Sequence, residues 1–265
     1  MYDVNYHRAS SVSQAAKLMK GAEDGKILAG GMTLLPTMKQ RLAAPSDLVD
    51  IGRLDELKGI KVSGKSVTIG AATTHAEVAS NAKLQKACPA ICHLAAHIGD
   101  PHVRHRGTIG GSIANNDPAA DYPAAMLALN ATIHTNKRKI DADKFFKGMF
   151  ETALKDGEIV TAVEFTAPAK CGYATFPNPA SRYAMAGVFV AKGKDGARVG
   201  VTGAGSDGVF RLKALEKALD KSFSADAADG VSVDAGDMLS DIHASAEYRA
   251  NLVKVMAKRA IAKAD

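Results

Sequence analysis

Residues 107–123 read GTIGGSIANNDPAADYP, and the apolar run PAAMLAL continues from Pro123. A Gly-Gly step stands between two hydroxyl residues, Thr108 and Ser112. Because glycine has no side chain, such a step lets the backbone come very close to another group, with N–H donors available to an anion. The PAAMLAL run predicts a helix, with Pro123 at its favoured first position. The stretch therefore predicts a close approach of the backbone followed at once by a new helix.

A second Gly-Gly step lies in AGGMT, residues 29–33, between an expected strand (KIL) and an expected helix (TLLPTMKQRLA) with Thr33 as its N-cap. Free N–H groups at such a turn favour a phosphate, although a tight strand-to-helix turn alone also needs small residues. Two such loops together form a pair that can clamp a pyrophosphate from both sides. On this hypothesis a side chain at Gly31 or Gly110 would fill the space of the phosphate.

Asp121 stands just ahead of the expected helix. A carboxylate in this place accepts hydrogen bonds from the hydroxyls of a bound nucleotide, or it caps the helix, and the residues leave both open. Arg104 and Arg106 are surface residues, or they neutralise phosphate or pair with Asp100 or Asp117. None of these side chains is predicted to be a catalytic acid or base.

A third glycine motif, GAGSDG at residues 203–208, fits the G-x-G-x-x-G dinucleotide fingerprint. The strand before it reads as half of a hairpin that turns at KDG, and no second buried parallel strand follows it. This motif is therefore interpreted as a turn. The chain also lacks a G-x-x-x-x-G-K-[ST] phosphate loop.

The strand and helix patterns predict an α+β fold, with an N-terminal domain followed by a smaller C-terminal domain of a hairpin plus helices. Ser11 with Gln14 predicts a helix start, as does Thr74 before HAEVAS, and EIVTAVEF (158–165) predicts a strand. The proline-containing stretch 166–181 is expected to be a linker or a domain entry. We expect two domains, residues 1–165 and 166–265.

The composition, with 46% hydrophobic and 23% charged residues, is that of a soluble globular protein. No apolar run approaches the roughly 20 residues that span a bilayer, and the first residues lack a signal pattern, so we expect a cytoplasmic protein that is not integral to a membrane. The chain has no Trp and 5% aromatic residues, which disfavours single-stranded nucleic acid as a partner. The net charge of +6 is then a solvated basic surface.

The three cysteines, Cys88, Cys92 and Cys171, do not indicate a disulfide framework. Cys88 and Cys92 share a helix face beside His93, but packing is favoured over a metal site. Three thiols are also too few for an iron–sulfur cluster, which takes about four. No metal is therefore expected in this chain.

Five segments in order carry a resemblance: AGGMTLLPTMKQRL, GDPHVRHRGTIGGSIANNDPAADYPA, GEIVTAVEF, ASRYAMAGVFVA and AEYRANLVKVMAKRA. The chain resembles, over nearly its whole length, the FAD-binding medium subunit of the molybdenum hydroxylases, the group of carbon monoxide dehydrogenase and xanthine dehydrogenase. The resemblance implies a two-subdomain FAD-binding domain of the PCMH (vanillyl-alcohol-oxidase-like) type. A smaller C-terminal sheet-and-helix domain of the carbon monoxide dehydrogenase flavoprotein type follows it.

The same resemblance implies the residues that bind FAD. Asp121 matches an acidic residue near the sugar-alcohol chain of FAD, Ile159 or Val160 an apolar contact, and Tyr183 a side chain near the flavin ring. The pyrophosphate would lie between Ala29, Gly30, Gly31, Met32 and Thr33 on one side and Thr108, Ile109, Gly110, Gly111 and Ser112 on the other.

This chain departs from the family pattern at three places. Thr33 stands where Ser is usual and keeps a hydroxyl, and Ser112 stands where Asn is frequent, so it loses an amide but keeps a donor. FPNPAS (176–181) stands where some relatives place a lysine near the flavin, which leaves the electron acceptor open.

The resemblance also implies a function. A large subunit oxidises substrate at a molybdenum cofactor, and electrons pass through two [2Fe–2S] clusters of a small subunit to FAD in this chain and then to a quinone or NAD. Dimers of such heterotrimers are common in the family. Two alternatives stay open from the residues: a self-contained flavin oxidoreductase with its own substrate pocket, and a non-enzymatic nucleotide-binding or assembly module. Asp117, His102 and His105 are expected to be loop-ordering or surface groups.

Overall fold

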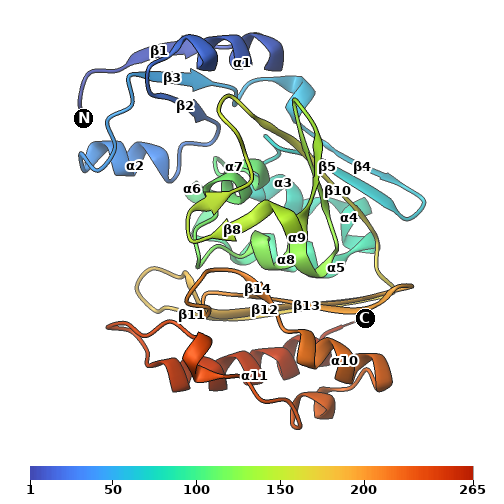
Figure 1. Ribbon diagram of the computed structural model, residues 1–265. Coiled ribbons are helices and arrows are strands. Elements are labelled where there is room, and N and C mark those ends of the chain that lie inside the picture. The colour runs from blue at the N-terminus through green and yellow to red at the C-terminus, as the bar shows by residue number, and fades with distance from the viewer. Residues whose placement is uncertain (265) are drawn as a thin grey trace.

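The computed structural model describes residues 1–264 (Figure 1). Its first sheet is parallel, in the order β1-β3-β2, and the helix after β1 packs against it. Ser11 caps that helix by accepting the N–H of Gln14, as the sequence predicts. The elements are β1 (Asn5–Arg8), α1 (Val12–Gly21), β2 (Gly25–Leu28), α2 (Leu34–Lys39) and β3 (Asp47–Asp50).

The second sheet is antiparallel, with the order β4-β5-β10-β6-β7, so the expected 158–165 strand lies in its centre. Thr74 begins the first helix after this sheet's opening hairpin, in a capping box with Glu77. The strands are β4 (Ile60–Ser63), β5 (Ser66–Gly70), β6 (Thr132–Thr135), β7 (Lys139–Asp141) and β10 (Val160–Thr166).

The helices between β5 and β6 are short, and a proline and an asparagine set two of their limits. Pro89 separates two of them, and Asn130 ends the last one in the left-handed conformation, both as expected. That last helix begins at Tyr122, one residue before Pro123. The helices are α3 (His75–Ser80), α4 (Ala82–Ala87), α5 (Pro89–His97), α6 (Pro101–Arg104), α7 (Ile109–Asn115) and α8 (Tyr122–Ala128).

The third sheet is antiparallel, in the order β11-β12-β13-β14, and helices cover both of its faces (Figure 1). Helices α5 and α8 pack on one face, and α10 and α11 on the other. Double coverage explains why β12 is buried over nearly its whole length. The elements are β11 (Lys170–Pro177), β12 (Ala184–Gly193), β13 (Gly196–Thr202), β14 (Phe210–Arg211), α10 (Lys213–Lys221) and α11 (Ala246–Ala262).

The remaining elements are short. A small hairpin of β8 and β9 follows the second sheet's edge, and three 3-10 turns complete the described chain. They are η1 (Asp55–Leu57), α9 (Ala142–Phe145), β8 (Phe146–Gly148), β9 (Glu151–Thr152), η2 (Ala225–Ala228) and η3 (Ala235–Asp237).

Of the two expectations for 166–181, a linker or a domain entry, the linker is wrong, because most of the stretch is strand β11 of the third sheet. Its prolines lie at 168, 177 and 179, so residues 170–176 keep their N–H groups and pair with β12. The GAGSDG motif is a turn between the antiparallel strands β13 and β14, as interpreted, and does not open into a helix.

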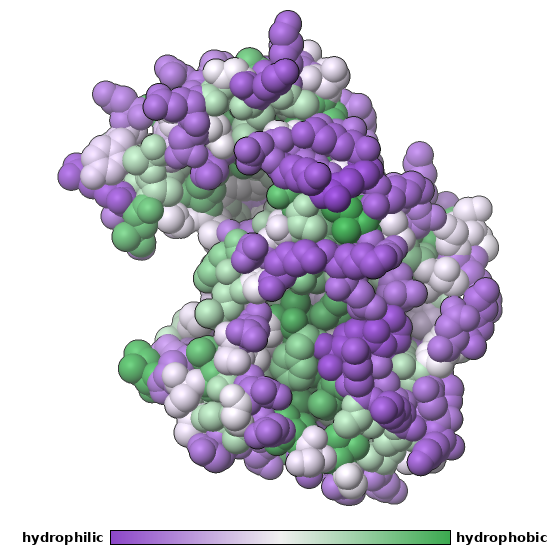
Figure 2. Space-filling view, in the orientation of Figure 1, coloured by the Kyte–Doolittle hydropathy of each residue, from purple (hydrophilic) through white to green (hydrophobic). Residues whose placement is uncertain are grey.

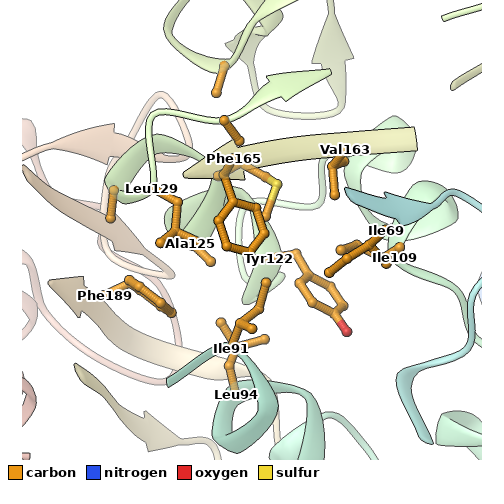
Figure 3. Close-up of a cluster of buried hydrophobic side chains, with 14 of the residues drawn as sticks. Ile69, Ile91, Leu94, Ile109, Tyr122, Ala125, Leu129, Val163, Phe165 and Phe189 are labelled. Carbon is orange, nitrogen blue, oxygen red and sulfur yellow. The ribbon is translucent and has the colours of Figure 1, made fainter. Parts of the chain in front are cut away.

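The largest core cluster lies between the second sheet and its helices (Figure 3). Phe189 from the third sheet points into the same cluster as Ile91 and Ala125, so the two parts of the chain share apolar packing. The third sheet comes very close to helix α8 at Gly200 of β13, where a Cβ atom would overlap the carbonyl of Ala124. Helix α8 therefore lies directly on the third sheet.

We expect Gly200→Ala to lower the free energy of unfolding by about 2 kcal/mol, because the methyl group pushes α8 away from the sheet. Urea unfolding of the purified chain measures this. Gly193→Ala is the matched control, since no atom lies within 4 Å of its added Cβ. Equal stability of the two variants would contradict the close packing.

Candidate functional site

A cleft of about 570 Å³ lies between the first sheet and the rest of the molecule. Figure 2 shows the surface hollowed below the lobe that the first sheet forms. The cleft brings together nearly all of the site residues expected from the sequence, although they come from five separate segments. Those that line it are Ala29, Gly30, Gly31, Met32, Thr33, Thr108, Gly110, Gly111, Ser112, Asp121, Ile159, Val160 and Tyr183.

Ile109 is the exception among the expected residues. Its side chain is fully buried in the largest core cluster, and its N–H donates to the carbonyl of Thr73. Ile109 therefore anchors the second Gly-Gly loop to the core behind the cleft.

The first loop, residues 29–33, presents unpaired donors. Within the described chain, the N–H groups of Gly30, Gly31, Met32 and Thr33 have no backbone or side-chain acceptor. Gly31 has φ +74°, a conformation that a side chain would strain. Thr33 precedes α2 without capping it, so its hydroxyl is also free of a protein partner. The loop is thus a cradle of hydrogen-bond donors that fits an anionic group.

The second loop has a different design from the one the sequence suggested. Its N–H groups are used inside the protein: Gly110 donates to the carbonyl of Ala71 at 2.9 Å, and Gly111 to Oγ1 of Thr108 at 3.2 Å. The expectation that a side chain at Gly31 or Gly110 would fill phosphate space is wrong, because a Cβ at Gly110 would meet Ala71 and one at Gly31 would meet Leu28 and Leu35. Gly111 has more room, since Thr108 Oγ1 at 3.0 Å is the one atom within 4 Å of an added Cβ in the described chain.

The two loops touch each other. A Cβ atom on Gly30 would overlap the carbonyl of Arg106 and lie 2.9 Å from Cα of Gly107. Gly30 therefore serves the approach of the second loop, and the donors of residues 30–33 and the hydroxyl of Ser112 line one continuous cleft.

Asp121 lies in the wall of the cleft, and it does not cap the helix, which is one of the two roles that the sequence leaves open. It precedes α8, but its side chain makes no capping hydrogen bond and instead accepts the hydroxyl of Tyr173. Burial raises the pKa of Asp121 to about 6, and the Tyr173 hydrogen bond opposes part of that rise. Asp117, which also lines the cleft, has its pKa raised by burial.

The upstream arginines and histidines lie outside the cleft lining. Arg104 donates to the carbonyls of Ile98 and Gly99 and so stabilises the end of α5, and it pairs with neither acidic residue proposed for it. Arg106, His102 and His105 are exposed, in keeping with the surface role expected for them.

Two residues of the cleft, Glu158 and His75, were not predicted from the sequence. Glu158 is buried and accepts both Nε and Nη2 of Arg138 and the hydroxyl of Thr135, which lowers its pKa to about 2. His75 is 4% exposed, and burial lowers its pKa to about 4, so the ring is neutral at pH 7. For Glu158 the sequence does hold a signal, because its partner Arg138 belongs to the basic run NKRK. The two residues are twenty positions apart, so no local pattern pairs them.

The cysteines pack in the interior. Cys88 Sγ lies 3.6 Å from Sγ of Cys171, not beside His93, and burial raises the pKa of Cys92 to about 12. In the described chain, no three His, Cys, Asp or Glu side chains are grouped for a metal ion. Among the same residues, no helix combines the length and apolarity that crossing a bilayer requires.

Residues 2–168 match the family model described as the FAD binding domain in molybdopterin dehydrogenase. The chain belongs to this family. It is an FAD-dependent oxidoreductase subunit of the carbon monoxide and xanthine dehydrogenase type, with the α+β fold that its sequence implies.

Curated relatives with 34% and 36% identity align with nearly the whole chain. The nicotine 6-hydroxylase medium subunit of Paenarthrobacter nicotinovorans is 34% identical over 98% of this chain and 97% of its own. The glyceraldehyde dehydrogenase medium chain of Sulfolobus acidocaldarius is 36% identical over 97% of each. A solved structure of carbon monoxide dehydrogenase from Hydrogenophaga pseudoflava superimposes with a TM-score of 0.88 at 33% identity, over 99% of this chain and 97% of that one.

We expect Glu158→Gln to lower the free energy of unfolding by about 2 kcal/mol at pH 7, because Arg138 then loses its charged partner. The carboxylate has a pKa of about 2 in the folded chain, against 4.5 for an ordinary glutamate. Its contribution is therefore complete above pH 4.5 and is lost as the pH falls through about 2. Urea unfolding between pH 7 and pH 2 measures both effects.

Asp141→Asn is the matched control for this prediction, since its carboxylate is 62% exposed and its ion pair with Lys144 is a surface one. A Glu158→Gln variant as stable as this control at pH 7 would contradict the role of the buried pair.

Proposed function

We propose that this chain carries FAD in the cleft and passes electrons from [2Fe–2S] clusters of a small subunit to an external acceptor, a quinone or NAD. Substrate oxidation would take place in a large molybdenum-containing subunit. The observation that carries the proposal is the unpaired donor set at residues 30–33, facing a cleft whose other wall holds Ser112 and Asp121.

The residues present fit the cofactor. The N–H groups of residues 30–33 are suited to the pyrophosphate, and the hydroxyls of Thr33 and Ser112 add donors. Asp121 is placed to accept hydrogen bonds from the sugar-alcohol chain, and Ile159 and Val160 supply an apolar wall. Tyr183, 46% exposed at the cleft, is the proposed contact of the flavin ring. Bound FAD supplies the redox chemistry, and the chain supplies binding and orientation.

The relatives support the assembly but not one substrate. Their names speak of nicotine, glyceraldehyde and carbon monoxide at 33–36% identity, so similarity does not single out a substrate for this chain. Each is called a medium subunit or medium chain, which supports a large and a small partner here. We further propose a dimer of heterotrimers, a cytoplasmic location, and two domains, 1–165 and 166–265.

The first test is the cofactor content of the purified chain, by visible spectrum and chromatography of what denaturation releases. FAD near one per chain is expected. Without its partners, the chain should keep FAD yet show little turnover with simple substrates. Rapid flavin reduction by such a substrate in the chain alone would favour a self-contained flavin oxidoreductase, and a colourless chain that takes up no FAD would leave a nucleotide-binding or assembly module.

Gly111→Val is expected to lose most of its FAD, because the side chain enters the cleft beside Ser112, while the thermal midpoint changes little. Flavin content and thermal unfolding are measured together. Gly21→Val is the control, since its added Cβ meets no atom within 4 Å and it lies outside the cleft. Full flavin content in Gly111→Val would defeat the placement of the pyrophosphate at this loop.

A further inference from the structure

We propose that Tyr173 is a positioning residue for FAD, whose hydroxyl holds the Asp121 carboxylate in place at the wall of the cleft. The inference rests on the proposed function, since it assumes that Asp121 receives the hydroxyls of FAD. It adds a residue of the third sheet, beyond the 2–168 match, to the machinery of cofactor binding.

Tyr173 reaches Asp121 from behind the cleft. It lies in β11, is 1% exposed and is absent from the cleft lining, and its hydroxyl donates to Oδ1 of Asp121. No other side chain of the described residues donates a hydrogen bond to this carboxylate. The rotamer of Asp121 therefore depends on Tyr173.

The hydroxyl of Tyr173 has little freedom to move. Gly187 on the neighbouring strand leaves the room it occupies, because a Cβ there would lie 2.8 Å from the Tyr173 oxygen. Phe189 packs beside the ring with centroids 6.0 Å apart. Gly172 lies against the carbonyl of Ala260 in α11, which fixes the strand itself.

The third sheet also holds the segment that leads to Asp121. The hydroxyl of Thr202 lies 3.0 Å from the carbonyl of Pro118 and 2.6 Å from that of Ala120, and the N–H of Gly203 donates to Pro118 at 2.8 Å. Backbone and side chain of this part of the cleft wall are thus both fixed from the same sheet.

The groups around Asp121 determine how its pKa changes when the Tyr173 hydroxyl is removed. Tyr173 and His97 favour the carboxylate, and Asp117 and burial favour the neutral acid. Tyr183 also faces this pair of acids, and burial raises its pKa, so it is uncharged at pH 7. Removing the Tyr173 hydroxyl therefore raises the pKa of Asp121 above its value of about 6.

The experiment measures the dissociation constant of FAD by quenching of its fluorescence, with the full 265-residue chain freed of flavin, between pH 5 and 9. The wild type should lose affinity as the pH falls through about 6. Tyr173→Phe should bind FAD about tenfold more weakly at pH 7, with the midpoint moved to higher pH. Asp121→Asn should bind FAD weakly, and its affinity should show no midpoint near pH 6.

Tyr122→Phe is the matched control, because Tyr122 is equally buried and its hydroxyl has no hydrogen-bond partner in the described chain. It should bind FAD like the wild type. Should Tyr173→Phe fail to fold, as judged by thermal unfolding, Gly187→Ala displaces the same hydroxyl and should weaken FAD binding in the same direction.

Two results overturn the proposal. One is an unchanged affinity and midpoint in Tyr173→Phe or, if that variant does not fold, in Gly187→Ala. The other is a midpoint that persists in Asp121→Asn, which would assign the titration to a group other than Asp121. A wild-type chain that binds no FAD at any pH would instead overturn the proposed function.

Discussion

The packing of α8 on the third sheet is the constraint on which the rest of the structure depends. Gly200 lets β13 come against the carbonyl of Ala124, and the Arg198 side chain donates to the carbonyl of Leu127 at 2.8 Å, so the sheet contacts the backbone of the helix directly. The same sheet then holds the loop before α8. The cleft wall that carries Asp117 and Asp121 belongs to the matched family domain but is held from behind by Tyr173, Thr202 and Gly203, which lie outside it.

The two Gly-Gly loops look alike in sequence but do different physical work. In the first, the donors of residues 30–33 are unpaired and face the cleft. In the second, Ile109 and Gly110 give their N–H groups to Thr73 and Ala71, so the loop is fastened to the end of β5. The anion-binding capacity is concentrated on one loop, and the other supplies a rigid opposing wall with Ser112 and Gly111.

Local sequence signals predicted the helix ends that a capping side chain or a left-handed residue fixes. Ser11 and Thr74 begin helices because their hydroxyls accept N–H groups within the next turn, and Asn130 ends one by its left-handed backbone. The stretch around β11 was misread as a linker, since prolines at its ends suggested irregular structure. Its state depends on pairing with β12, which local composition does not report.

By itself the sequence determined the α+β class, the two glycine loops and most of the cleft residues, because glycines, hydroxyl residues and apolar periodicity act over a few neighbouring positions. Only the tertiary structure decided which N–H groups stay unpaired, and that Glu158 meets Arg138 and Asp121 meets Tyr173. These pairs join residues 20 and 52 positions apart. Such contacts depend on how whole elements pack, and burial then sets the pKa of each group.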